Sequence, residues 1–399
     1  ETLFKSVQKL APGHHLVVEH GKLTVHRYWD LQFTTDRWNR TFEEVVEELH
    51  GLLGSTVRDH MIADVPVGVL LSGGVDSSAV LNFAVQGTDK PVKAFTIGFD
   101  GNQVVDERPF ARMAAQRFGA EHHELTITAE DFWNFLPGYV WHMEEPVCEP
   151  PAIALHYISE LARKHVKVVL SGEGGDEAFA GYPNYPHMLR LEKIRRSMGP
   201  LARPVGTVAG YAGDLFGWER TRRYGHALGR PLEEYYFSRT STPAATFNRN
   251  AHEIFSPSFL AATSDNAAAA FMAGLLQPVK KSSLLDQMLY ADTKTWLPDD
   301  LLVKADKITM ASSLELRVPL LDHKVLEFAA SLPQEYKVRG KETKRAHKAT
   351  VSKILPEEVL TRKKAGFPVP YSRWLSGPLA PRVREIILAE KALSRGYYD

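Results

Sequence analysis

The sequence predicts an α/β fold, a doubly wound parallel sheet followed by a helical C-terminal region. Short strand-like segments, of which 67–71 is wholly apolar, alternate with segments of helical spacing between about residues 40 and 185. Such alternation is typical of a parallel sheet with helices on both faces. Two of the apolar segments end in glycine-rich turns, and beyond Tyr182 the strand pattern gives way to helical spacing with Pro and Gly punctuation.

The amino-acid composition excludes or disfavours several classes of function. The 399 residues are 44% hydrophobic and 24% charged, as in ordinary globular proteins of two or three domains. Lys plus Arg and Asp plus Glu both number 48, so no overall basic field favours nucleic acid or a membrane. Cys148 is the single cysteine, which excludes an intrachain disulfide and a thiolate zinc cluster. It favours a reducing, cytoplasmic location, and no apolar run is long enough to cross a bilayer.

The elements follow in order from the N-terminus. Alternation around His20-Gly21 predicts a small hairpin, and Thr41 with Glu44 forms a capping box that opens a helix. Apolar-rich segments predict strands at 67–71, 92–99 and 166–170, and the segment HHELTI at 122–127 is predicted as a further strand. Helical spacing predicts helices at 77–85, 107–118, 129–142 and 152–164.

The first glycine-rich turn, "SGGVDSS" from Ser72 to Ser78, joins a strand to a helix start. Glycines let the backbone approach a ligand, successive amides form an anion nest, and the helix dipole adds positive charge. The Walker pattern with its lysine is absent, and Asp76 instead places a carboxylate there. A divalent cation between carboxylate and phosphates explains this arrangement, whereas a plain turn with Asp76 favouring the helix start remains the alternative.

This turn resembles the pyrophosphate loop of the ATP pyrophosphatases, which cleave ATP between the α- and β-phosphates. The second turn, "VVLSGEGGDEAFAGY" at 168–182, resembles the matching segment of the asparagine synthetases and related amide-forming enzymes. The segments 304–323 ("KADKITMASSLELRVPLLDH") and 355–375 ("LPEEVLTRKKAGFPVPYSRWL") do so too, in family order. The resemblance implies an adenine nucleotide α-hydrolase-like sheet with ATP as substrate and Mg²⁺ as cofactor.

The implied reaction has two steps. The side-chain carboxylate of aspartate attacks the α-phosphate and expels pyrophosphate, and ammonia then displaces AMP to give asparagine. The resemblance implies that Asp76 and Asp176 hold Mg²⁺. It also implies that Glu173 is the base that takes a proton from the attacking ammonia, and that Lys364 contacts the α-phosphate. Taken alone, Glu173 is equally typical of an exposed turn, and Lys364 of a surface run in which Lys363 is the alternative register.

The resemblance also implies the remaining ATP contacts, with adenine held by main-chain groups. The implied ATP-binding residues are Leu71, Ser72, Gly73, Gly74, Val75, Asp76, Ser77, Ser78, Ile97, Ser171 and Gly172. Asp106 and Glu107 either add to an acidic site or start a helix. Arg317 either binds a substrate carboxylate or forms a buried ion pair with Glu315 or Asp322.

The same resemblance sets the expected domains. Residues 1–30 resemble the end of a glutaminase domain and its linker, and residues 31–399 a synthetase domain with an α/β part at about 40–185 and a helical part at about 186–399. Family members with glutamine amidotransferase activity begin with a cysteine nucleophile, whereas position 1 here is Glu. We therefore expect a glutaminase domain outside this numbering, or ammonia from solution or a partner. A homodimer is compatible with the sequence.

Other functions remain open from sequence. The same chemistry on another acid is found in β-lactam synthetases and lasso-peptide macrolactam cyclases, and the motifs do not define the acid pocket. A tRNA-modifying pyrophosphate-loop enzyme is disfavoured by the single cysteine and zero net charge. A nucleotide-binding scaffold without activity is disfavoured because Asp76, Glu173, Asp176 and Lys364 are all present.

Overall fold

The computed structural model describes residues 2, 4, 6–34, 39–101, 106–145, 147, 149–236, 250–262, 267–362 and 369–398. These residues fall into two compact units, each treated by itself below. The first contains residues 1–179, 297–337 and 344–373, and the second contains residues 180–296, 338–343 and 374–399.

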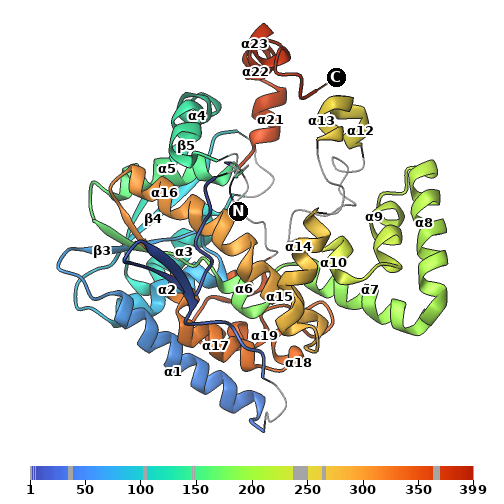
Figure 1. Cartoon of the computed structure of the whole chain (residues 1–399). Helices are drawn as coiled ribbons and strands as arrows, with labels where there is room; N and C mark the ends of the chain where they lie inside the picture. Colours follow the sequence, from blue (N-terminus) through green and yellow to red (C-terminus); the bar gives the residue numbers. More distant parts are fainter. Residues whose placement is uncertain are drawn as a thin grey trace. The chain divides into compact units, whose positions relative to one another are not determined.

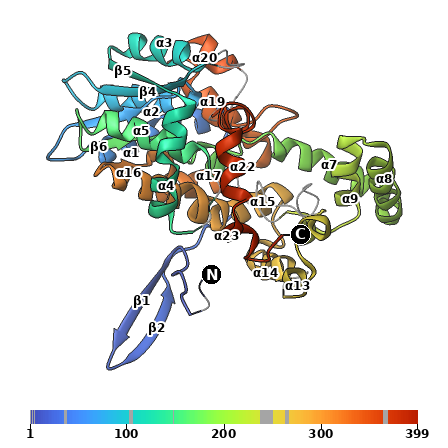
Figure 2. The same cartoon turned by 90° about the horizontal axis from the view of Figure 1, so that it is seen from above.

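The first unit opens with the expected hairpin and capped helix. Strands β1 (His14–Glu19) and β2 (Lys22–Arg27) pair antiparallel around His20-Gly21, as Figure 2 shows. Helix α1 (Phe42–His60) begins after Thr41, whose hydroxyl accepts from the Glu44 amide while the Glu44 side chain accepts from the Thr41 amide. The predicted capping box is therefore present, and it satisfies amides that the first helical turn leaves without partners.

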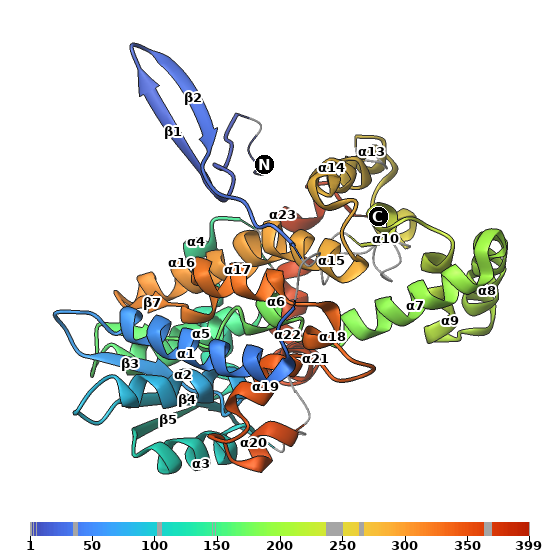
Figure 3. The same cartoon turned by 90° about the horizontal axis from the view of Figure 1, so that it is seen from below.

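A five-stranded parallel sheet organises the first unit. Its order is β5-β4-β3-β6-β7, and β3, β4 and β5 are seen side by side in Figure 3. The strands are β3 (Val67–Leu70), β4 (Lys93–Phe99), β5 (Glu121–Ile127), β6 (Val168–Leu170) and β7 (Glu315–Arg317). The order reverses direction at β3, because β4 and β5 extend to one side and β6 and β7 to the other.

Two groups of helices pack on this sheet, consistent with the doubly wound arrangement that the alternation predicted (Figure 1). In one group α2 and α3 contact the strands and α1 packs on α2; in the other α5 contacts the strands, with α4 and α16 packed on α5. These helices are α2 (Val75–Gln86), α3 (Arg108–Phe118), α4 (Ala129–Met143), α5 (Pro151–Ala162) and α16 (Val303–Ala311).

Short helices complete the first unit around the ends of the strands. Helix α19 lies beside α1 (Figure 3), and α6 directly follows strand β6. They are α6 (Gly175–Phe179), a π-helical turn (Leu297–Leu302), α17 (His323–Ser331), α18 (Gln334–Lys337), α19 (Arg345–Val351), α20 (Glu357–Thr361) and α21 (Tyr371–Ser376), the last of which ends in the second unit.

Strand β7 corrects the sequence analysis, which expected only helices after Tyr182. It has three residues, Glu315 to Arg317, and pairs with β6 alone. Such a short edge strand, with charged residues at both of its ends, produces neither a long apolar run nor an alternating pattern. The fold class is nevertheless as predicted, an α/β unit with a parallel sheet and a helical remainder.

The second unit is helical in its described part. Helices α8 and α9 pack closely, and Gly210 and Gly225 face each other so that a Cβ at Gly225 would lie 2.6 Å from the Gly210 nitrogen. Its helices are α7 (Asn184–Met198), α8 (Ala202–Phe216), α9 (Glu219–Leu228), α10 (Leu232–Tyr235), α12 (Ala251–Ile254), α13 (Pro257–Ala261), α14 (Ala267–Leu275), α15 (Leu284–Lys294), α22 (Ala380–Ile387) and α23 (Glu390–Leu393). Across the described residues, no helix has both the length and the apolar character needed to traverse a bilayer.

Candidate active site

The first glycine-rich turn leaves the carboxyl end of β3 and leads into α2. Gly73 has a φ of +65°, and a Cβ there would lie 2.4 Å from the Ala111 nitrogen of α3, so only glycine fits without strain. Within the turn, Ser77 Oγ accepts from the Ser72 amide at 3.2 Å and lies 3.1 Å from Ser72 Oγ. The turn is therefore held in one shape, with the N-terminus of α2 behind it.

The second glycine-rich turn leaves the neighbouring strand β6 and packs directly on the first. A Cβ at Gly172 would lie 2.5 Å from the Ser77 amide nitrogen, and one at Gly175 would lie 2.6 Å from Asp76 Oδ1. Because β3 and β6 are parallel neighbours, their carboxyl ends meet at one edge of the sheet. The two turns that the sequence identified separately thus form one continuous surface.

Asp76 and Asp176 converge on one cationic atom. Lys344, at the start of α19, places its Nζ 2.5 Å from Asp76 Oδ2 and 2.8 Å from Asp176 Oδ1. The side chain is buried, which by itself would lower the pKa of the Lys344 ammonium, but Asp176 and Asp76 outweigh burial and raise that pKa above its ordinary value. Lys344 is therefore charged, and it offsets the repulsion between the two carboxylates.

His347 adds a second nitrogen group on the other side of Asp76. Its Nε2 lies 3.1 Å from Asp76 Oδ1, and its ring, fully buried, stacks on Phe179 with centroids 5.0 Å apart. The two oxygens of Asp76 thus face one nitrogen each, from Lys344 and from His347.

The donor set fits a divalent metal such as Mg²⁺. The carboxylates of Asp76 and Asp176 come from different strand-end turns and both contact the ammonium of Lys344. Hard cations such as Mg²⁺ prefer carboxylate oxygens as ligands. Asp76 and Asp176 are the residues that would hold the ion, with Lys344 in the position of a neighbouring or competing cation.

Glu173 lies in the second turn and faces a buried lysine. Its Oε1 is 3.5 Å from Nζ of Lys304 on α16, and its backbone amide donates to Ser171 Oγ at 2.9 Å. Its Oε2 is buried without a hydrogen-bond partner in the part of the chain that the structure describes. The carboxylate is thus held in a defined position and keeps one oxygen for a ligand.

The main-chain groups expected to hold adenine have partners of their own. The Leu71 amide donates to Phe95 O at 2.8 Å, and Leu71 O accepts from the Thr96 hydroxyl at 2.6 Å. Ile97 is in the middle of β4, and the Ser171 amide donates to Arg317 O at 2.9 Å. The amides of Leu71 and Ser171 are therefore occupied, whereas a carbonyl oxygen keeps a second lone pair that can accept from a base.

Asp106 and Glu107 lie at the start of α3, and both pair with arginines. Asp106 accepts from Arg108 at 2.9 Å, which lowers the pKa of the Asp106 carboxyl. Glu107 forms an ion pair with Arg362, both side chains being largely buried, and Arg362 also donates to Gly73 O at 3.4 Å. Arg362 therefore connects the first turn to α3.

Arg317 pairs with Glu315, one of the two predicted partners, but the pair is not buried because 55% of the Glu315 side chain is exposed. Its Nε donates to Glu315 at 2.7 Å, and its Nη1 donates to the carbonyls of His60 and Ile62, each at 2.8 Å. These contacts hold β7 against the end of α1. Lys363 and Lys364 lie outside the described residues.

Sequence reasoning missed Lys344, His347, Lys304 and Arg362. Lys344 and Asp76 are 268 positions apart, and a lone lysine between a turn and a helix carries no local signal. Its left-handed backbone, with a φ of +54°, is not visible in the sequence. Lys304 and Arg362 lie in segments that the resemblance had already marked, so those segments were the available signal.

A parallel α/β sheet with two glycine-rich turns at its carboxyl edge defines a nucleotide-binding class of protein. The family model for asparagine synthase matches residues 48–399. The chain belongs to the asparagine synthase family.

Individual relatives agree with the family model. Glutamine-hydrolyzing asparagine synthetase 1 of Bacillus subtilis (strain 168) is 34% identical over 387 residues, 97% of this chain and 59% of that protein. Amidase chyE of Penicillium rubens is 25% identical over 440 residues, 100% of this chain and 64% of that protein. Among solved structures, NMN synthetase from Francisella tularensis is 19% identical with a TM-score of 0.26, over 36% of this chain and 59% of that chain. The chain spans less than two thirds of the length of these curated relatives.

Proposed function

We propose that this chain is the synthetase part of an AMP- and pyrophosphate-forming amide ligase that converts aspartate to asparagine with ATP. The observation that carries the proposal is the convergence of Asp76 and Asp176, from two neighbouring strand-end turns, on one cation position. That position adjoins the anion nest of the first turn, so nest and carboxylates together suit a metal-bound triphosphate.

In the first step the chain has to accommodate charge that grows on phosphate oxygens. The amides of Ser72, Gly74 and Ser78 donate within the protein, so the other amides of the turn, its hydroxyls and the N-terminus of α2 are the groups that donate to the leaving pyrophosphate. Lys344 adds a fixed positive charge nearby. Asp76 and Asp176 are the residues that would hold Mg²⁺, which when bound would neutralise part of this charge. Lys364 is proposed to contact the α-phosphate.

In the second step ammonia attacks the acyl adenylate, and the nitrogen must lose a proton as AMP leaves. We assign that proton to Glu173, whose Oε2 has no hydrogen-bond partner among the described residues while Oε1 faces Lys304. Lys304, 3.5 Å from Oε1, holds the carboxylate in place. The relatives named as glutamine-hydrolyzing are longer than this chain, so the source of ammonia is part of the test.

The same chemistry on a different acid is the second candidate. The relative named as an amidase aligns with the whole chain at 25% identity, so this scaffold occurs under more than one activity name. The nest and carboxylates would act identically in both cases, because they contact ATP and not the acid.

The test is acid-dependent pyrophosphate release. The protein is supplied with ATP, Mg²⁺, either ammonium or glutamine, and one acid from a panel of amino acids, β-amino acids and peptides. Asparagine formed only with aspartate supports the first candidate, and product from another acid supports the second. ATP cleavage to ADP and phosphate, or no turnover with any acid, contradicts both.

Two variants test the residue roles against matched controls. Asp76→Asn should reduce pyrophosphate release by at least about 100-fold, a loss of roughly 2.7 kcal/mol of transition-state stabilisation. Glu173→Gln should reduce amide formation more than acid-dependent exchange of labelled pyrophosphate into ATP. The exposed Asp89→Asn and Glu43→Gln should behave as wild type. Normal turnover of either site variant refutes its assigned role.

A further inference from the structure

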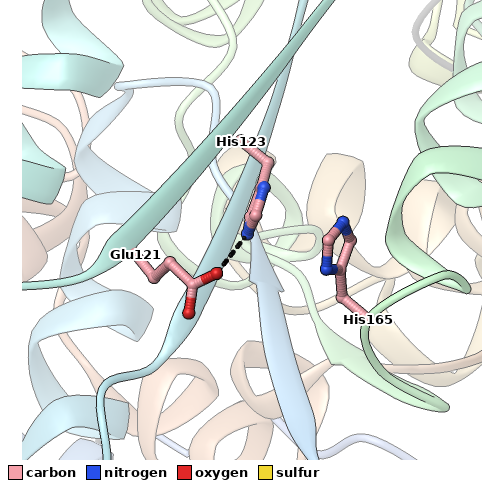
Figure 4. A group of neighbouring side chains, drawn as sticks. All are labelled: Glu121, His123 and His165. Atoms are coloured by element: carbon pink, nitrogen blue, oxygen red, sulfur yellow. Dashed lines mark hydrogen bonds and ion pairs between the residues drawn. The ribbon is translucent and has the colours of Figure 1, made fainter.

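A second cluster of titratable side chains lies away from the nucleotide edge of the sheet. It comprises Glu121 and His123 on β5 and His165 in the turn between α5 and β6, as Figure 4 shows. Glu121 opens β5, and His165 comes three residues before β6 begins. Both glycine-rich turns follow the carboxyl ends of parallel strands, so this cluster is at the opposite, amino ends.

The three side chains present their ligand atoms to one another. One atom from each lies within 4.8 Å of the other two, and His123 Nε2 is 2.9 Å from Glu121 Oε1. Glu121 and His123 are two positions apart on one strand, which places them on the same face of the sheet. The rings of His123 and His165 are neighbours, with centroids 4.1 Å apart.

The surroundings hold the cluster in this arrangement. The His123 ring stacks on Phe95 of the adjacent strand β4, with centroids 5.4 Å apart at 17°. Lys93, also on β4, places its Nζ 3.8 Å from Glu121 Oε2 and leaves Oε1 directed at His123. His123 is mostly buried, with 21% of its side chain exposed, whereas Glu121 at 47% keeps the cluster open to solvent.

We propose that Glu121, His123 and His165 form a three-ligand site for a borderline divalent cation, of which Zn²⁺ is the type. Imidazole nitrogens and a carboxylate oxygen are the donors zinc prefers, at about 2.0–2.2 Å from the metal. A tetrahedral ion places its ligand atoms roughly 3.4 Å apart, so side-chain movements of about 1 Å close the site. Water takes the fourth position, through the exposed side of Glu121.

The charge state of the cluster suits a metal ligand set. A metal binds imidazole through the lone pair of a deprotonated ring nitrogen. As metal ligands, two imidazoles and one carboxylate carry a net charge of −1, which a divalent cation changes to +1. Lys93 is then repelled by the metal, and the partial exposure of its side chain to solvent keeps this repulsion small.

The site would join the edge strand of the sheet to the segment that leads into β6. In strand order β5 and β6 are separated by β4 and β3, so a metal ion would connect chain segments not adjacent in the ladder. Its role is then structural, and it is independent of the amide-ligase chemistry at the other edge.

The experiment is a metal titration of untagged, chelator-treated protein in excess Mg²⁺, which occupies hard-ligand sites. Zn²⁺ affinity is measured by competition with a chromophoric chelator, and Co²⁺ is followed by its visible ligand-field bands. We expect one equivalent of each metal per chain, tetrahedral Co²⁺ bands, and a higher melting temperature in Zn²⁺. His123→Gln and His165→Gln should each weaken Zn²⁺ binding by at least about tenfold.

The controls separate this site from other histidines and from the proposed function. His15→Gln removes one ring of the stacked His15–His26 pair in the hairpin and should leave Zn²⁺ binding unchanged. Asp76→Asn should lose ligase activity yet still bind Zn²⁺. If a histidine variant of the cluster fails to fold, X-ray absorption at the zinc edge of the wild type decides between two imidazole ligands and none. No stoichiometric binding, or binding that survives both cluster substitutions, overturns the proposal.

Discussion

Lys344 joins the two strand-end turns to a part of the chain that is far away in sequence. Its Nζ contacts Asp76 and Asp176, and its burial makes this a three-charge cluster shielded from water. A buried ion pair contributes little net stability when intact, but removal of one partner exposes the full cost of burying the others. The lysine is therefore most important when no other cation lies between the carboxylates.

Lys344→Met should reduce the free energy of unfolding by about 3 kcal/mol in metal-free buffer, because two carboxylates then face each other without a cation. Urea unfolding in EDTA measures this loss. Millimolar Mg²⁺ should recover part of it if the metal binds between Asp76 and Asp176. Lys341→Met, at an exposed position in the same loop, is the matched control and should change stability by less than about 0.5 kcal/mol. Equal effects of the two substitutions, or no response to Mg²⁺, would contradict the expectation.

At the scale of elements, the two glycine-rich turns act together because their backbones touch. The contact between Gly172 and the Ser77 amide leaves no room for a methyl group, and Gly175 is as close to Asp76. The first turn follows strand β3 and the second follows strand β6. The pairing of these two strands therefore determines the distance between the turns.

Gly172→Ala should push the second turn away from the first and reduce ATP·Mg²⁺ affinity by at least about tenfold, equal to 1.4 kcal/mol. Isothermal titration calorimetry with a non-hydrolysable ATP analogue measures it. Gly51→Ala is the control, since a Cβ at Gly51 meets nothing within 4 Å and α1 should gain about 0.5–1 kcal/mol from the lost glycine. Unchanged affinity in Gly172→Ala would show that the turns do not need to touch.

At the scale of the whole molecule, partly buried histidines connect stability to pH. Burial lowers the pKa of both His122 and His156 below the ordinary value of 6.5. His122 also lies 2.7 Å from the Thr96 hydroxyl, which donates to Leu71 O just before the first turn. Burial of the His122 ring beside Thr96 therefore disfavours the protonated form of His122.

Stability should decline as the pH falls below about 6.5. Between that value and the lower pKa of the folded state, the unfolded chain binds more protons than the folded chain, so protonation favours unfolding. Above pH 6.5 both states are neutral at these rings, and this contribution is flat. Urea midpoints measured from pH 5 to 8 test the trend, and His122→Gln should make the acid side of the curve shallower. A midpoint that rises on acidification would show the opposite sign of the shift.

Local patterns in the sequence predicted some of the strands and turns but not all of them. Strands β3, β4 and β6 were predictable because each is rich in apolar residues, and the turns after β3 and β6 because their glycines and acids lie next to one another in the chain. Strand β7 was not, since three residues with charges at both ends have no pattern of their own. The positions of Asp76, Glu173 and Asp176 followed from strand order, whereas their partners did not.

The sequence by itself determined the alternation of strands and helices, the two glycine-rich turns and the acidic residues they carry, because these depend on neighbours a few positions away. Only the tertiary structure decided that Lys344 and His347 meet Asp76, that Lys304 faces Glu173, and that His165 joins Glu121 and His123. These contacts join residues that the strand order and helix packing bring together, and the free energy that selects them comes from burial and charge in the folded chain.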